Sequence, residues 1–95
     1  MANVVGTWNI IQAGGATVAM NVTSPTDGTA RTGSTNGHFS QAQLSAQEFH
    51  FVIRWDNGPI GDYCGTFGID GRLRGQTFDA TNPHNQALWH SDKQF

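Results

Sequence analysis

The chain has 95 residues, of which 37% are hydrophobic and 13% are charged, and its formal net charge is −2 at pH 7. Its five basic residues are dispersed, which excludes the concentrated positive surface that binds nucleic acid or anionic lipid, and no segment approaches the roughly 20 apolar residues of a membrane span. The length predicts a single domain over residues 1–95, near the lower limit for a self-sufficient core.

Cysteine content and the first residues bear on the compartment. Cys64 is the sole cysteine, so an intrachain disulfide is impossible. The opening residues, MANVVGTW, lack the basic region and the apolar run of a secretory signal. We therefore expect either a cytoplasmic protein or a secreted protein whose signal has been removed.

Turn-forming pairs punctuate the chain at intervals of about 8 to 14 residues, which is the rhythm of an antiparallel meander. Asn36-Gly37 and Asp70-Gly71 are two such pairs, and both favour the positive φ angles of tight hairpins. In chain order the predicted strands cover roughly residues 4–12, 16–24, 28–35, 38–45, 48–56, 62–70, 72–80 and 86–93.

The fifth predicted strand, residues 48–56, shows the clearest alternation. One side carries the apolar residues Phe49, Phe51, Ile53 and Trp55, and the other carries His50, Val52, Arg54 and Asp56. The sixth strand continues the apolar side with Tyr63, Phe67 and Ile69. One buried face and one wet face are typical of an antiparallel sheet. Residues 41–49 are the best helix candidate, although that segment is short and uncapped.

Eight short strands joined by short links can form a β-sandwich or an up-and-down barrel. A sandwich usually needs at least one long Greek-key crossing, whereas the links here have hairpin length. Closure also removes sheet edges that so short a chain can hardly cover. We predict an all-β fold, an antiparallel up-and-down meander closed into a small eight-stranded barrel, with a β-sandwich as the alternative.

A set of short motifs resembles those of the calycin barrels, the avidins and lipocalins. Gly6-Thr7-Trp8 is similar to their GxW motif, and avidin-like intervals separate Ala16-Thr17-Val18, Asp27-Gly28 and Thr32-Gly33. The second half resembles a group of small avidin-like barrels through Tyr63-Cys64-Gly65, Asp70-Gly71, Gly75 to Phe78, and Trp89. The resemblance covers most of the chain and implies a barrel.

The same resemblance implies structural roles for Trp8 and Lys93. The indole of Trp8 is expected to plug the closed end of the barrel. Calycins place a basic residue of the last strand on that indole, and Lys93 is the candidate here. Biotin-binding residues of the avidins are replaced by Ile10, Gly14 and Thr35, so biotin is not the expected ligand.

Residues that can carry chemistry are scattered along the sequence. A metal site built across strands from His50, His90 and Cys64 is conceivable, but isolated histidines are the favoured interpretation, because no pair has a metal-site spacing. Cys64 near a histidine and Asp62 suggests a nucleophile, yet a small buried side chain is the usual role of a lone cysteine. We predict no catalytic residue, no metal and no cofactor.

Two aromatic residues flank a glycine-rich loop at one end of the predicted barrel. Trp55 and Tyr63 bracket residues 56–62, and rings at such a mouth contact flat ligands or sugars. Asp56 and Asp62 can supply hydrogen bonds there, although aspartates also occur in turns for structural reasons alone. We predict that Trp55, Tyr63, Asp56 and Asp62 form the binding site.

The leading functional hypothesis is a non-enzymatic barrel that binds a small molecule or glycan at its open end. A protein-interaction module, such as a small protease inhibitor or an oligomeric structural unit, is the alternative. A lumen-based isomerase or cyclase comes third, because it requires His50, Arg54 and Arg74 to face inward. Apolar residues at outward positions favour a homo-oligomer. These residues are Ile11, Val52, Phe78 and Leu88.

Overall fold

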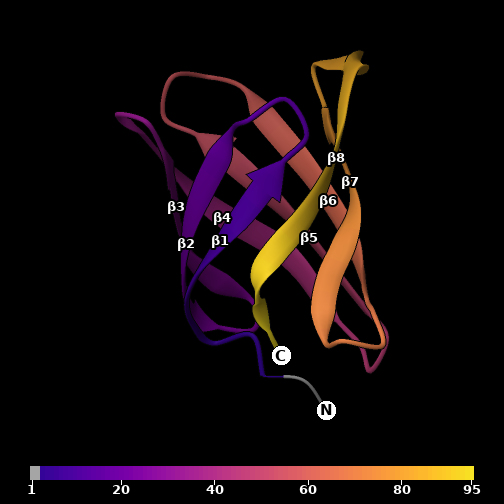
Figure 1. Ribbon diagram of the computed structural model, residues 1–95. Coiled ribbons are helices and arrows are strands. Elements are labelled where there is room, and N and C mark those ends of the chain that lie inside the picture. The colour runs from indigo at the N-terminus through magenta and orange to yellow at the C-terminus, as the bar shows by residue number, and fades with distance from the viewer. Residues whose placement is uncertain (1–2) are drawn as a thin grey trace.

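Eight antiparallel strands follow one another in the computed structural model, which describes residues 3–95 apart from the side chain of Pro83 (Figure 1). Each strand pairs with its neighbours in sequence. No helix within the described residues is long and apolar enough to cross a membrane. The strands are β1 (Gly6–Gln12), β2 (Thr17–Ser24), β3 (Asp27–Thr32), β4 (Thr35–Leu44), β5 (Glu48–Trp55), β6 (Ile60–Phe67), β7 (Arg72–Asp79) and β8 (Asn82–Gln94).

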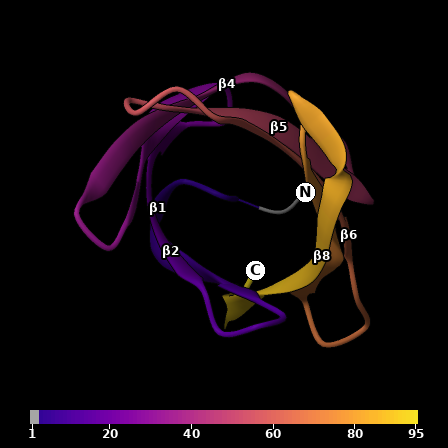
Figure 2. The same cartoon turned by 90° about the horizontal axis from the view of Figure 1, so that it is seen from above.

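Pairing of the first strand with the last closes the sheet. In this β1–β8 seam, Ile10 lies opposite Ser91 and Gln12 opposite Trp89. The ring of strands is visible when the molecule is viewed along the barrel (Figure 2). The predicted closed meander is therefore confirmed and the sandwich alternative is wrong, because neither end strand is left with an unpaired edge at the seam.

The helix candidate at residues 41–49 is wrong. That segment forms the end of β4, a turn and the start of β5. A bulge between Ser40 and Gln43 interrupts the β4–β5 ladder, and Gln41 has a φ of 54°. The bulge bends β4 while both flanks stay paired with β5, and this pairing overrides the weak local preference for helix.

Alternation along β5 fills the core as predicted. Phe49, Phe51 and Ile53 are fully buried and point inward, whereas Arg54 is exposed. Val52 occupies an outward position yet is only 7% exposed. Ile69 does not continue the inner face of β6, because β6 ends at Phe67 and Ile69 lies fully exposed in the turn that follows.

Aromatic side chains fill the middle of the lumen. The rings of Phe51 and Tyr63 stack in parallel with their centroids 5.1 Å apart, and Trp89 meets both rings edge-on at about 6 Å. Gly65 makes room for the indole, because a Cβ at this position would lie only 2.7 Å from the Trp89 ring. The lumen is thus a packed core at this level.

The lower end of the barrel, as drawn in Figure 1, is closed by residues near both chain ends. The indole N–H of Trp8 donates a hydrogen bond to the carbonyl oxygen of Val4 at 2.9 Å, and Val4 is fully buried. Phe95 packs edge-on against Trp8 with the ring centroids 5.0 Å apart. The ammonium group of Lys93 lies over the Phe95 ring, 5.5 Å from its centroid. The basic residue thus packs on the ring that contacts the Trp8 indole, whereas the resemblance implies packing on the indole itself.

Candidate functional site

The upper end of the barrel holds a hollow of about 400 Å³, which we call the mouth pocket. Its walls come from strands all around the barrel, and its loop-side rim includes Pro59, Asp79 and Asn85. Its lining side chains include Gln12, Trp55, Tyr63 and Thr77.

Polar groups meet at the floor of the mouth pocket. The side-chain amide of Gln12 donates a hydrogen bond of 3.0 Å to the hydroxyl oxygen of Tyr63, which is also hydrogen-bonded with Thr77. Tyr63 is only 3% exposed, and this burial raises the pKa of its phenol above the usual value despite the two hydrogen bonds. The phenol is therefore neutral at physiological pH and can both donate and accept a hydrogen bond.

Trp55 forms one wall of the mouth pocket at the end of β5, where its side chain is half-buried. The link that follows is tightly held. The Trp55 N–H donates to the Pro59 carbonyl at 3.0 Å, and the Gly58 N–H donates to the Trp55 carbonyl at 3.0 Å. These hydrogen bonds hold the backbone of Trp55 in place, so its indole has a fixed attachment point at the pocket wall.

The two predicted aspartates lie elsewhere. Asp56 is exposed, and its N–H donates to the Asn36 carbonyl of β4 at 2.9 Å. Asp62 points to the outer face of β6, where its carboxylate is 2.8 Å from Nε2 of His50. Asp62 precedes the inward Tyr63 by one residue, and consecutive strand residues face opposite sides. The structure thus brings Trp55 and Tyr63 together at the mouth without these carboxylates.

Sequence reasoning missed Gln12 and Thr77. Gln12 has the same parity as Trp8 and Ile10 on β1, and Thr77 has that of Leu73 on β7, so both side chains point inward. A polar residue at the inward parity close to the end of a strand is the signal that would have found them.

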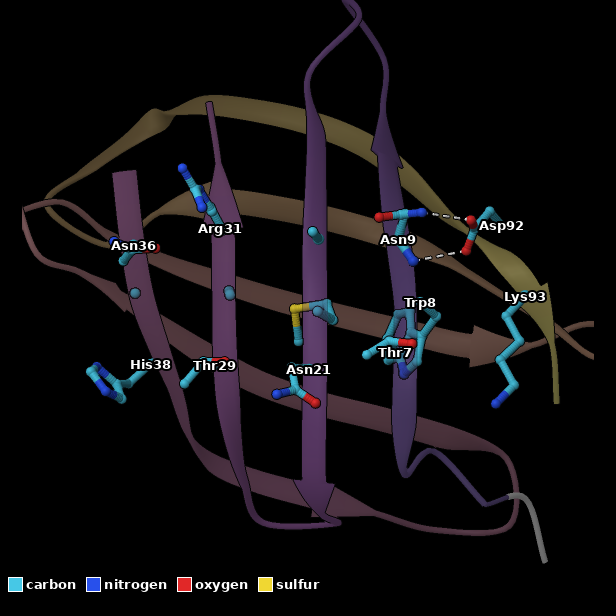
Figure 3. Close-up of a pocket in the computed structure, with 14 residues that line it drawn as sticks. Thr7, Trp8, Asn9, Asn21, Thr29, Arg31, Asn36, His38, Asp92 and Lys93 are labelled. Atoms are coloured by element: carbon cyan, nitrogen blue, oxygen red, sulfur yellow. Dashed lines mark hydrogen bonds between the residues drawn. The ribbon is translucent and has the colours of Figure 1, made fainter. Parts of the chain in front are cut away.

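A larger hollow, of about 590 Å³, lies on the outer wall over β1 to β4 (Figure 3). Thr7, Asn21, Thr29 and His38 are consecutive cross-strand partners and form one row of it. In the next row the small side chain of Ala19 lies between Asn9 and Arg31 and leaves the space open. Side chains of these two rows line the hollow on the outer wall.

Asp92 borders the outer-wall hollow and is held by Asn9. The backbone N–H and the side-chain amide of Asn9 each donate to the Asp92 carboxylate at 2.8 Å (Figure 3). Partial burial opposes ionisation of Asp92, but these hydrogen bonds outweigh it and lower its pKa. The pair fastens β8 to β1 beside the seam.

Cys64, His50 and Asp62 meet on the outer wall, on β5 and β6. Cys64 is exposed, which corrects the expectation of a buried thiol, since it faces outward between the inward Tyr63 and Gly65. Partial desolvation of the exposed thiol, the charge and hydrogen bond of Asp62 and the charge of Glu48 all raise the pKa of Cys64. A raised pKa keeps the thiol protonated and does not activate a nucleophile.

The remaining sequence candidates are separated from this group. His90 lies on β8, with β7 between it and Cys64, so the combination of His50, His90 and Cys64 is not assembled on adjacent strands. Arg54 and Arg74 are exposed, and His50 faces the outer wall. The inward orientation that a lumen-based isomerase or cyclase requires is therefore not met by these three residues.

Comparison of the sequence with known protein families finds no family that matches the chain, and comparison with curated proteins finds none that is similar to it.

Proposed function

We propose that the protein binds a small molecule or a sugar non-covalently in the mouth pocket and does not transform it. The observation that carries this proposal is a hollow of about 400 Å³ above a lumen that is otherwise filled with side chains. Pockets for small ligands usually measure roughly 300–1,000 Å³ and combine apolar walls with a few placed polar groups. The mouth pocket has both properties.

Each part of the pocket supports a particular contact. The half-buried indole of Trp55 offers a flat apolar surface for an aromatic ring or the apolar face of a sugar. The Tyr63 hydroxyl, the Gln12 amide and the Thr77 hydroxyl offer donors and acceptors at the floor. An uncharged, flat ligand with hydrogen-bonding groups on one edge matches this arrangement.

The motifs that resemble those of calycins support the proposal, because avidins and lipocalins bind ligands at the open end of a barrel. We propose that this chain is a barrel of that kind. Ile10, Gly14 and Thr35 stand where avidins carry biotin-binding residues, so a ligand other than biotin is expected.

The test is a screen of uncharged aromatic compounds and glycans by thermal shift and by tryptophan fluorescence. A true ligand should raise the melting temperature, and Trp55→Ala should abolish that shift. Tyr63→Phe should weaken binding by about tenfold, because it removes one hydrogen-bonding group and keeps the ring. Tyr63→Ala is unsuitable because the ring is part of the core.

His38→Ala on the outer wall is the matched control and should leave binding unchanged. If ligands are found but bind Trp55→Ala as tightly as the original chain, the mouth pocket is not the binding site. If the screen yields no ligand at all, the protein-interaction alternative moves ahead.

A further inference from the structure

Three metal-ligating side chains converge on the outer wall of the barrel, away from the mouth pocket. Cys64 on β6 is the direct cross-strand partner of His50 on β5, and Asp62 precedes Cys64 by two residues and so faces the same side. The Asp62 carboxylate lies 2.8 Å from His50 Nε2 and 3.7 Å from Cys64 Sγ. One ligand atom from each residue lies within 4.8 Å of the other two.

These separations are close to those in a tetrahedral zinc site. Zinc binds nitrogen, oxygen and sulfur ligands at about 2.0–2.3 Å, so its ligand atoms lie roughly 3.3–3.8 Å apart. Small side-chain rotations would bring the three atoms to that spacing without moving the paired backbone of β5 and β6. A paired sheet therefore already holds the ligand set in place.

The chemistry of the set selects the ion. A thiolate and an imidazole favour borderline and soft ions over calcium or magnesium, which take all-oxygen sites. Three protein ligands leave one of four tetrahedral positions for water or another molecule. Binding of the ion displaces the thiol proton of Cys64 to solvent and puts a metal–sulfur bond in its place.

The cluster is also accessible. His50 and Cys64 line a hollow of about 410 Å³ on the outer wall, and its other lining residues include Glu48, Arg74 and Gln76. Side-chain exposure is 37% for His50 and 22% for Asp62, so an ion can enter without opening the barrel. The carboxylate of Glu48 adds negative charge, whereas nearby Arg74 is engaged in a two-point contact with Asp70.

We propose that His50, Asp62 and Cys64 form a site for a zinc-like divalent transition ion, with its fourth position open. The site lies on the outer wall, and none of its three residues lines the mouth pocket.

The test uses the full chain without a histidine tag, titrated with Co²⁺ as a spectroscopic substitute for zinc. One Co²⁺ per chain should bind and give the absorption of tetrahedral cobalt together with a thiolate-to-metal charge-transfer band, and Zn²⁺ should displace it. Cys64→Ser should remove the charge-transfer band. His50→Gln and Asp62→Asn should each weaken binding by at least about tenfold, since even loss of a residue that only supports a ligand has an effect of that size.

His90→Ala is the control, because it removes an exposed histidine of the neighbouring wall and should leave binding unchanged. Alkylation of Cys64 by iodoacetamide in the unmutated chain gives a measurement free of folding effects, and zinc should slow it. Uptake that survives Cys64→Ser with its charge-transfer band intact, equal weakening by His90→Ala, or no protection of Cys64 would overturn the proposal.

Discussion

Asp70, Asp79 and Asp92 each accept hydrogen bonds that favour the ionised carboxylate. The Arg74 guanidinium reaches Asp70 at 2.6 and 2.9 Å, and the Thr81 hydroxyl and N–H reach Asp79 at 2.7 and 2.9 Å. With the two bonds from Asn9 to Asp92, these contacts lower the pKa of all three carboxyl groups. The chain has few charged residues, and these three aspartates stabilise two turns and the pairing of β1 with β8.

The lowered pKa values predict that the protein loses stability in acid. Because the folded-state pKa values lie below the unfolded value of about 3.9, the stabilisation is complete above that pH and is lost as pH falls through the folded values. The free energy of unfolding, measured by denaturant titration from pH 6 to pH 2, should decline below about pH 4. The free energy of unfolding of the Asp92→Asn variant should decline less steeply with falling pH, whereas that of the Thr29→Ala variant should keep the original slope. An unchanged slope in Asp92→Asn would contradict this role.

Single residues show how far the sequence predicts the candidate site. Rings next to a glycine-rich link stand out in the sequence, and Trp55 and Tyr63 line the same hollow in the structure. Nearness in the chain places Asp62 in the predicted site as well, although its parity is opposite to that of Tyr63. Which residues share a site in a barrel depends on strand alternation more than on separation along the chain.

At the scale of elements, β5 shows most directly how the alternation of inward and outward side chains determines their contributions to stability. Phe51→Ala should lower the free energy of unfolding by about 3–5 kcal/mol, because it removes a fully buried ring that contacts Tyr63 and Trp89. Arg54→Ala, on the exposed face of the same strand, should cost less than about 1 kcal/mol. Chemical denaturation of both variants makes the comparison, and equal losses would count against the inward and outward assignment.

The strands themselves were largely predictable, since turn residues and alternation are local signals. Their irregularities were not. The bulge in β4 depends on how Ser40 and Gln43 pair with β5, and the sequence of β4 alone carries no such information. β6 begins at Ile60, earlier than predicted, because its first residues pair with both Arg54 and Asp79 across the ladders.

At the scale of the whole molecule, short links indicated a barrel, but the closing register could not be read from the sequence. Pairing between β1 and β8 joins residues about 80 positions apart, and no local signal specifies which residues face each other. The sequence suggests Cys64 near a histidine and Asp62, but it does not decide between His50 and His90, because that choice depends on the register between β5 and β6.

Self-association is the remaining proposal at this scale. Leu88 is 61% exposed on β8 and borders a hollow of about 510 Å³ on the outer wall, beside Ala13 and Gly75. An apolar side chain in such a position favours contact with a second copy. Light scattering after size-exclusion chromatography should show an oligomer that Leu88→Lys converts to a monomer, while Thr66→Lys leaves it intact. A monomer at all concentrations for the original chain would contradict the proposal.

The two ends of the barrel differ, because the lower end is closed by side chains and the upper end holds the mouth pocket. Val4, Trp8 and Phe95 meet there, so both ends of the described chain lie at the far side of the barrel from the mouth pocket (Figure 1). A partner that contacts Phe95 at the closed end would leave the mouth pocket open to solvent. The closed end and the proposed ligand site thus lie at opposite ends of the barrel.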